Sequence, residues 1–198
     1  MPNWCSSKMV VLGNPTELKK FRNKLLEAMK RSETNNHWHL YEIYEVFGYT
    51  EELILKDKND TLGYNRGYIE DVGDIHNGRL DVYYESAWSP MIDGFDYLLS
   101  HHYTTLRQVT LSEEPGEELF INTDRSHKIL PERFYLYVED YDTYYPKSVP
   151  ELCNIINQYN DNDKKVTTLN ECFNLIKKHK NYIGSNQVYM CLNEFCCC

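Results

Sequence analysis

The segment from residue 68 to residue 86 constrains the fold most, because its pattern is that of a β-hairpin. Asn77-Gly78 separates two apolar arms, and this dipeptide is the strongest short-range signal for a two-residue hairpin turn. From Leu80 to Glu85, apolar and polar residues alternate, which is the period of a strand with one covered face. The sequence therefore predicts two antiparallel strands near the middle of the chain.

A strand and a helix are predicted on each side of this hairpin. Residues 8–12 form a short apolar run that ends at Gly13, and Asn14-Pro15 then supplies an N-cap and a first helical residue. A second helix is expected to open at Ser89-Pro90, and residues 105–113 form a further strand. Apolar residues recur at helical spacing in both helices: Leu18, Phe21, Leu25, Leu26 and Met29, then Met91, Phe95, Leu98 and Leu99.

This order of elements predicts an α+β protein with a ferredoxin-like fold. Strand, helix, hairpin, helix and strand make the split β-α-β arrangement, an antiparallel sheet with helices on one face. A further antiparallel pair, residues 118–122 with 133–139, is expected to extend the sheet. We expect one domain over residues 1–140, with an inserted segment at 37–66 that holds a helix and then a loop at 57–67.

The last part of the chain, residues 141–198, is expected to be a small helical appendage. Residues 148–159 and 168–179 have helical periodicity, and Thr168 to Glu171 matches a capping box. A final strand is predicted at 187–192. Because so short a segment buries little apolar surface alone, we expect it to dock on the first domain.

Charge and hydropathy narrow the classes of partner. The formal net charge is −9, from 30 acidic and 21 basic residues, and such a surface repels phosphate backbones. Direct nucleic-acid binding is therefore not expected. The chain has no apolar run of membrane-spanning length, and its first residues lack the features of a signal peptide. We expect a soluble cytoplasmic protein whose oligomeric state the sequence leaves open.

Seven cysteines fit a reducing compartment better than a disulfide framework. The count is odd, and Cys196-Cys197-Cys198 are poorly placed to pair with one another. A structural zinc site using Cys191, Cys196, His37 and His39 is an alternative, but paired ligands at C-x2-C spacing are missing. We expect no metal and no cofactor.

No local motif specifies a reaction. Phosphate loops, dinucleotide fingerprints and nucleophile elbows are all missing from the sequence. Active sites can be assembled without such motifs, so an enzyme or small-ligand-binding protein stays an alternative. Its carboxylates would be Glu85 with Glu113 or Glu114, near the strand-to-helix junction.

The sheet face turned away from the helices is the most informative surface. If apolar residues of the strands face the helices, Tyr and Glu side chains face the other way. Exposed Tyr anchors with carboxylates suit a basic protein partner, whereas the C-terminal helices covering this face would make it a second core. Trp88 is expected mainly to fix the strand-to-helix corner. The candidate partner-binding residues are Tyr83, Glu85, Trp88, Glu113, Glu114, Tyr135, Tyr137 and Glu139.

Two segments resemble the YubB-type ferredoxin-like proteins, which are encoded mostly by phages, plasmids and other mobile elements. They are the opening Met1–Cys5, with its strand to Gly13, and Glu85–Pro90, followed by the acidic turn Glu113–Gly116. The resemblance covers parts of residues 1–139 and implies a fold and a bacterial-host setting, but no reaction. It suggests a non-enzymatic inhibitor of a host defence system, anti-CRISPR-like, whose acidic surface engages a basic groove.

Overall fold

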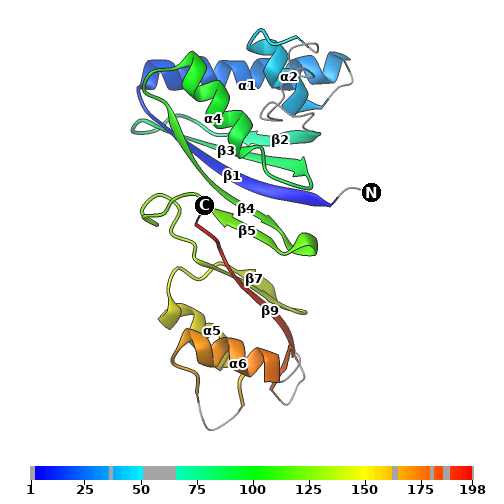
Figure 1. Ribbon diagram of the computed structural model, residues 1–198, viewed down its shortest axis with the longest axis vertical. Coiled ribbons are helices and arrows are strands. Elements are labelled where there is room, and N and C mark those ends of the chain that lie inside the picture. Colours follow the sequence, from blue (N-terminus) through cyan, green and yellow to red (C-terminus); the bar gives the residue numbers. More distant parts are fainter. Residues whose placement is uncertain are drawn as a thin grey trace. The chain divides into compact units, whose positions relative to one another are not determined.

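The computed structural model is an α+β protein with two antiparallel sheets (Figure 1). It describes residues 3–35, 38–50, 66–161, 165–178, 181–184 and 188–197. The chain divides into two compact units, Met1–Leu119 and Phe120–Cys198. Most of the loop predicted at 57–67 lies outside the described residues.

The first unit is built on β1 (Trp4–Leu12), which pairs on both of its edges. Its neighbours are β3 (Arg79–Ala87) and β4 (Arg107–Glu114), and β2 (Gly67–Val72) pairs with β3. All three pairings are antiparallel, and the sheet order is β2-β3-β1-β4-β5. In β5 (Leu119–Asn122) the chain passes from the first unit to the second.

The predicted hairpin is confirmed in β2 and β3. Asn77 and Gly78 have φ values of 50° and 74°, so both turn residues have left-handed backbone. A two-residue turn of this kind has the twist that antiparallel strands need, and Asn-Gly adopts it at little cost. His76 and Arg79 close the turn by exchanging two backbone hydrogen bonds of 3.0 and 2.9 Å.

Three helices cover one face of the first sheet (Figure 1). They are α1 (Pro15–Asn35), α2 (His39–Val46) and α4 (Ile92–His102). Asn14 begins α1 as predicted, and its Oδ1 accepts a hydrogen bond from the Thr16 N–H at 2.8 Å. Residues of alternate strand positions meet the helices in one core, which includes Met9, Val11, Leu18, Phe21, Leu80, Val82, Tyr84, Phe95 and Leu98.

The second unit has its own sheet and core, whereas a helical appendage with a single final strand at 187–192 was expected. Its strands β6 (Phe134–Val138), β7 (Asp142–Tyr144), β8 (Tyr182–Ile183) and β9 (Val188–Glu194) have the order β7-β6-β9-β8. The two predicted helices are present as α5 (Val149–Tyr159) and α6 (Leu169–Lys178). Strands and helices share a core that includes Phe134, Leu136, Val138, Leu152, Ile156, Cys172, Ile176 and Met190.

The predicted pairing of 118–122 with 133–139 is wrong. Strand β6 pairs antiparallel with β7 and β9, so it belongs to the second sheet. The division between compact units accordingly falls after Leu119 and not near residue 140. The alternation of apolar residues in β6 shows that one face is covered, but it does not say which sheet the strand joins.

Asp124 organises the loop that leads from β5 to β6. One carboxylate oxygen accepts hydrogen bonds from the backbone N–H and the hydroxyl of Ser126, and the other accepts from the N–H groups of Ile129 and Leu130. Burial raises the pKa of this carboxyl, but the four hydrogen bonds outweigh it and lower the pKa to about 2. The ionised side chain therefore stabilises the loop.

Asp124→Asn is expected to lower the free energy of unfolding by about 1–2 kcal/mol at pH 7. The folded pKa lies below the ordinary value of about 4, so the wild-type advantage is present above pH 4 and is lost as pH falls toward 2. Urea titrations followed by circular dichroism at pH 7, 5 and 3 would measure the difference. Asp140→Asn, at an exposed carboxyl, is the control; an equal loss in both variants would contradict the assignment.

Candidate functional site: the open face of the first sheet

Two carboxylates lie in one row across the three central strands of the first sheet. Ser6 of β1 is opposite Glu85 of β3 on one edge and opposite Glu113 of β4 on the other. Neighbouring strands are about 4.8 Å apart, so the two glutamates are separated by about 10 Å of sheet. The predicted pair is thus on one face, although its strands are not neighbours.

The alternation of β1 decides which way this row points. Cys5, Ser7 and Met9 are buried under the helices, whereas Ser6 is exposed and Glu85 and Glu113 are partly exposed. Partial burial raises the pKa of the Glu85 carboxyl, and the charge of Glu70 on the neighbouring strand raises it further. Several acidic groups therefore share this face.

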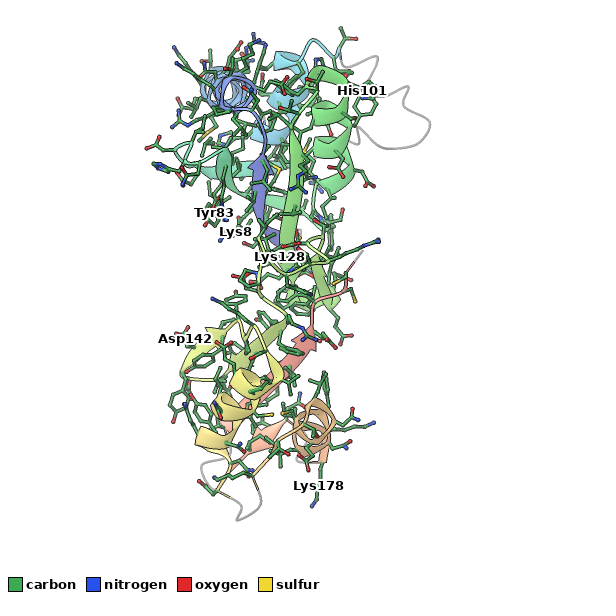
Figure 2. The ribbon with its side chains drawn as sticks, turned by 90° about the vertical axis from the view of Figure 1, so that its left-hand side faces the viewer. Lys8, Tyr83, His101, Lys128, Asp142 and Lys178 are labelled. Atoms are coloured by element: carbon green, nitrogen blue, oxygen red, sulfur yellow. The ribbon has the colours of Figure 1, made fainter. Side chains whose placement is uncertain are left out.

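Lys8 and Tyr83 form the next row on the same face. They are opposite one another in the register of β1 and β3, and the Lys8 ammonium lies 5.7 Å from the centre of the Tyr83 ring. Figure 2 shows the two side chains together at the sheet. Tyr83 is 36% exposed. The face therefore presents an aromatic ring and the Lys8 cation beside the two carboxylates, and further along β3 it carries the ion pair Arg79–Asp81.

Glu114 does not belong to this surface, although the sequence placed it there. It is buried, because the residue after Glu113 in a strand points to the opposite face. Its carboxylate accepts hydrogen bonds from the N–H groups of Gly116 and Glu117 and caps the short 3-10 helix η1 (Pro115–Glu117). Its role is to hold the turn between β4 and β5.

Trp88 lies at the corner between β3 and α4 with a left-handed backbone (φ 72°). Its N–H donates to the Asn3 carbonyl at 2.9 Å, and the neighbouring Ser86 hydroxyl donates to the Ser89 carbonyl at 2.7 Å. The corner is thus held by these two hydrogen bonds, while the indole side chain is 47% exposed. The expected packing anchor is therefore only half covered.

The remaining candidates lie in the second unit and do not extend the row. Tyr135 is buried against Phe120, with ring centres 4.8 Å apart, so it serves a local aromatic core. Tyr137 is 38% exposed and faces Cys191 of β9, and Glu139 is exposed just beyond β6. One continuous face from Tyr83 to Tyr137 was expected because β6 was assigned to the first sheet.

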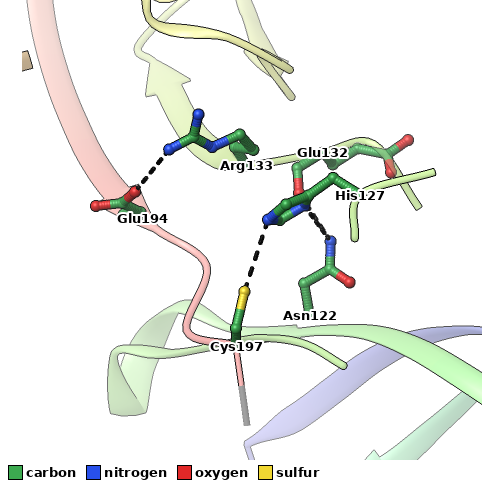
Figure 3. A network of polar contacts seen from close by, with 6 residues as sticks. All are labelled: Asn122, His127, Glu132, Arg133, Glu194 and Cys197. Carbon is green, nitrogen blue, oxygen red and sulfur yellow. Dashed lines mark hydrogen bonds and ion pairs between the residues drawn. The ribbon is translucent and has the colours of Figure 1, made fainter. Parts of the chain in front are cut away.

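A second polar cluster, which sequence reasoning did not find, lies in the second unit (Figure 3). Cys197 Sγ lies 3.6 Å from His127 Nε2, and Asn122 Nδ2 lies 3.4 Å from His127 Nδ1. Nearby, Arg133 forms an ion pair with Glu194 at 3.5 Å. Cys197 comes close to Asn122 and His127 because Cys196 forms a β-bridge with Ile121 of β5. No local sequence pattern indicates this long-range contact.

Backbone contacts fix the asparagine of this cluster. Asn122 is fixed by the backbone: its Oδ1 accepts from the Asp124 N–H, and its Nδ2 donates to the carbonyls of Leu130 and Glu132. Both N–H groups of Asn122 Nδ2 are thus donated to backbone carbonyls, and the asparagine holds the loop between β5 and β6. The Cys197 thiol beside His127 is exposed.

The zinc alternative also lacks geometric support. Within the described part of the chain, no group of three or more His, Cys, Asp or Glu side chains is arranged to hold a metal ion. His39 Nδ1 already accepts a hydrogen bond from the Ile69 N–H at 2.9 Å, and His37 lies outside the described residues. Cys5, Cys153, Cys172, Cys191, Cys196 and Cys197 are not in disulfides.

Comparison with known proteins adds no relative. No protein-family model, curated protein or solved structure matches the chain. The resemblance to the YubB-type proteins thus stays a prediction. Among the residues that the structure describes, no helix has the length and apolar character needed to cross a bilayer.

Thiol burial gives a direct test of the described structure. Cys5, Cys153 and Cys172 are buried, and burial raises the pKa of Cys5 to about 11 and that of Cys172 to about 12. Cys196 and Cys197 are exposed. We expect iodoacetamide at pH 8 to alkylate these two residues at least tenfold faster than the three buried cysteines. Mass spectrometry of peptides from native protein would measure this, with urea-unfolded protein as control. Rapid labelling of Cys5 in native protein would contradict the fold of the first sheet.

Proposed function

We propose that the protein is a non-enzymatic binding module whose first sheet engages a cationic protein partner through its open face. The observation that carries the proposal is the row Glu85–Ser6–Glu113, with Tyr83 and Lys8 directly beside it. Carboxylates steer a basic partner, and an exposed Tyr supplies contact area with little loss of entropy. Lys8, in the row next to the two acids, would help fix the register of the partner's charges.

The fold supports the ferredoxin-like assignment of the first unit. Its elements follow the order strand, helix, hairpin, helix and strand once α2 is set aside as an insertion, and its sheet order is β2-β3-β1-β4. The split β-α-β arrangement has antiparallel neighbours throughout, as here. In this arrangement helices cover one face of the sheet. On the other face Ser6 and Tyr83 are exposed, whereas Val10 is buried.

The resemblance to proteins of mobile elements suggests which class of partner the acidic face binds, namely a nucleic-acid-binding complex of the host. An acidic face that imitates a phosphate backbone would occupy the basic groove of a nucleic-acid-binding host complex, as an anti-CRISPR-like inhibitor does. The net charge of −9 agrees with that role. The enzyme alternative has less support, because Ser6 in the middle of the carboxylate row is exposed, whereas small-molecule sites are concave.

Neutralising the row should weaken binding of a cationic protein. The double variant Glu85→Gln/Glu113→Gln is expected to reduce affinity for an arginine-rich peptide probe about tenfold, since both carboxylates contact it. Calorimetry in 50 and 300 mM salt would measure this, and salt should weaken the wild type more than the variant.

The matched control is Glu33→Gln/Glu27→Gln, which removes the same charge from α1 on the helix side. Equal losses in both double variants would show attraction by net charge alone and would refute a site on the sheet. Affinity that does not depend on salt would refute mimicry of a phosphate backbone.

A further inference from the structure

A cavity lies on the helix side of the first unit, away from the open sheet face. Its volume is about 410 Å³, within the roughly 300–1,000 Å³ range of small-molecule sites. Helix α1 lines one wall with Lys20, Asn23, Lys24 and Glu27, which share one face of the helix. The ends of α2 and α4 supply Phe47, His102 and Tyr103.

The second wall is aromatic. The rings of Phe47 and His102 have centres 4.8 Å apart, and those of Phe47 and Tyr103 are 6.2 Å apart. Burial lowers the pKa of His102, and electrostatic interactions with His101 and Lys24 lower it further, so the imidazole is neutral at pH 7. A neutral, planar ring beside Phe47 is suited to stacking against an aromatic ligand.

The helical wall is cationic. Lys24 Nζ donates to the Val46 carbonyl at 2.7 Å and lies 5.8 Å from the Phe47 ring centre, so its charge is held beside the aromatic wall. Glu27 is the one acid in the lining, and it is ion-paired with Arg31 at 2.7 Å. Among the described residues, Lys20 and Asn23 have no side-chain hydrogen bond or ion pair, so their donors are available to a ligand.

We propose that this cavity binds a small planar aromatic molecule that carries an anionic group, such as a nucleoside monophosphate. The ring packs against Phe47 and His102, and the anion accepts hydrogen bonds from Lys20 and Asn23 in the field of Lys24. The overall charge of −9 repels such a ligand, so its affinity depends on these local groups. The site is independent of the proposed protein-binding face.

Adenosine monophosphate, adenosine and inorganic phosphate are the probes for this site. With the full chain in calorimetry, the monophosphate is expected to bind saturably and at least tenfold more tightly than adenosine or phosphate, because it alone uses both walls. Lys20→Ala should weaken monophosphate binding about tenfold. Phe47→Leu should weaken monophosphate and adenosine by similar factors, since it removes only the stacking surface.

Lys19→Ala is the matched control, because Lys19 is exposed on the same helix but does not line the cavity. It should leave the affinity unchanged within twofold. Circular dichroism establishes that each variant is folded, and Asn23→Ala, at an exposed residue, replaces Phe47→Leu if that variant unfolds. The proposal is refuted by lack of saturable monophosphate binding at millimolar concentration, by equal affinity for adenosine, or by equal losses in Lys19→Ala and Lys20→Ala.

Discussion

Strand β1 is hydrogen-bonded along both edges, and the first unit depends on this double pairing. A strand paired on both sides has a fixed register, and the register sends alternate side chains to opposite faces. Met9 and Val11 thereby meet the helices, while Ser6 and Lys8 meet solvent or their neighbours on the open face. A shift of one residue would bury Lys8 under α1 and expose Met9, so the core and the candidate site are set by the same pairing.

The parts of this arrangement that local chemistry controls could be predicted from the sequence. The Asn77-Gly78 turn fixes the β2–β3 register, and Asn14-Pro15 fixes the start of α1, because both depend on residues next to one another. The same alternation places Glu85 and Glu113 on the open face. The split β-α-β arrangement places β1 between β3 and β4. This strand order is enough to predict that Glu85 and Glu113 lie on either side of β1.

The parts that long-range pairing controls could not be predicted in this way. Strand β6 finds its partner β9 more than 50 residues later, and a pattern of alternating residues fits either sheet. Tyr135 and Tyr137 were therefore placed on the wrong surface together with β6. Glu114 was misjudged for a local reason, because a carboxylate that caps a 3-10 turn has the same sequence signature as an exposed acid.

The two layers of the first unit differ in charge. Helix α1 carries six Lys or Arg and three Glu, although the whole chain has a net charge of −9, whereas the open sheet face carries Glu85 and Glu113 beside Lys8 and the ion pair Arg79–Asp81. A helix layer lies about 10 Å from the far face of the sheet, which exceeds the Debye length of about 8 Å at physiological ionic strength. Through solvent, the charges of the two layers are therefore partly screened from each other. The cavity and the sheet face belong to opposite layers of one small fold, and the lysines that line the cavity act locally against the net charge of −9.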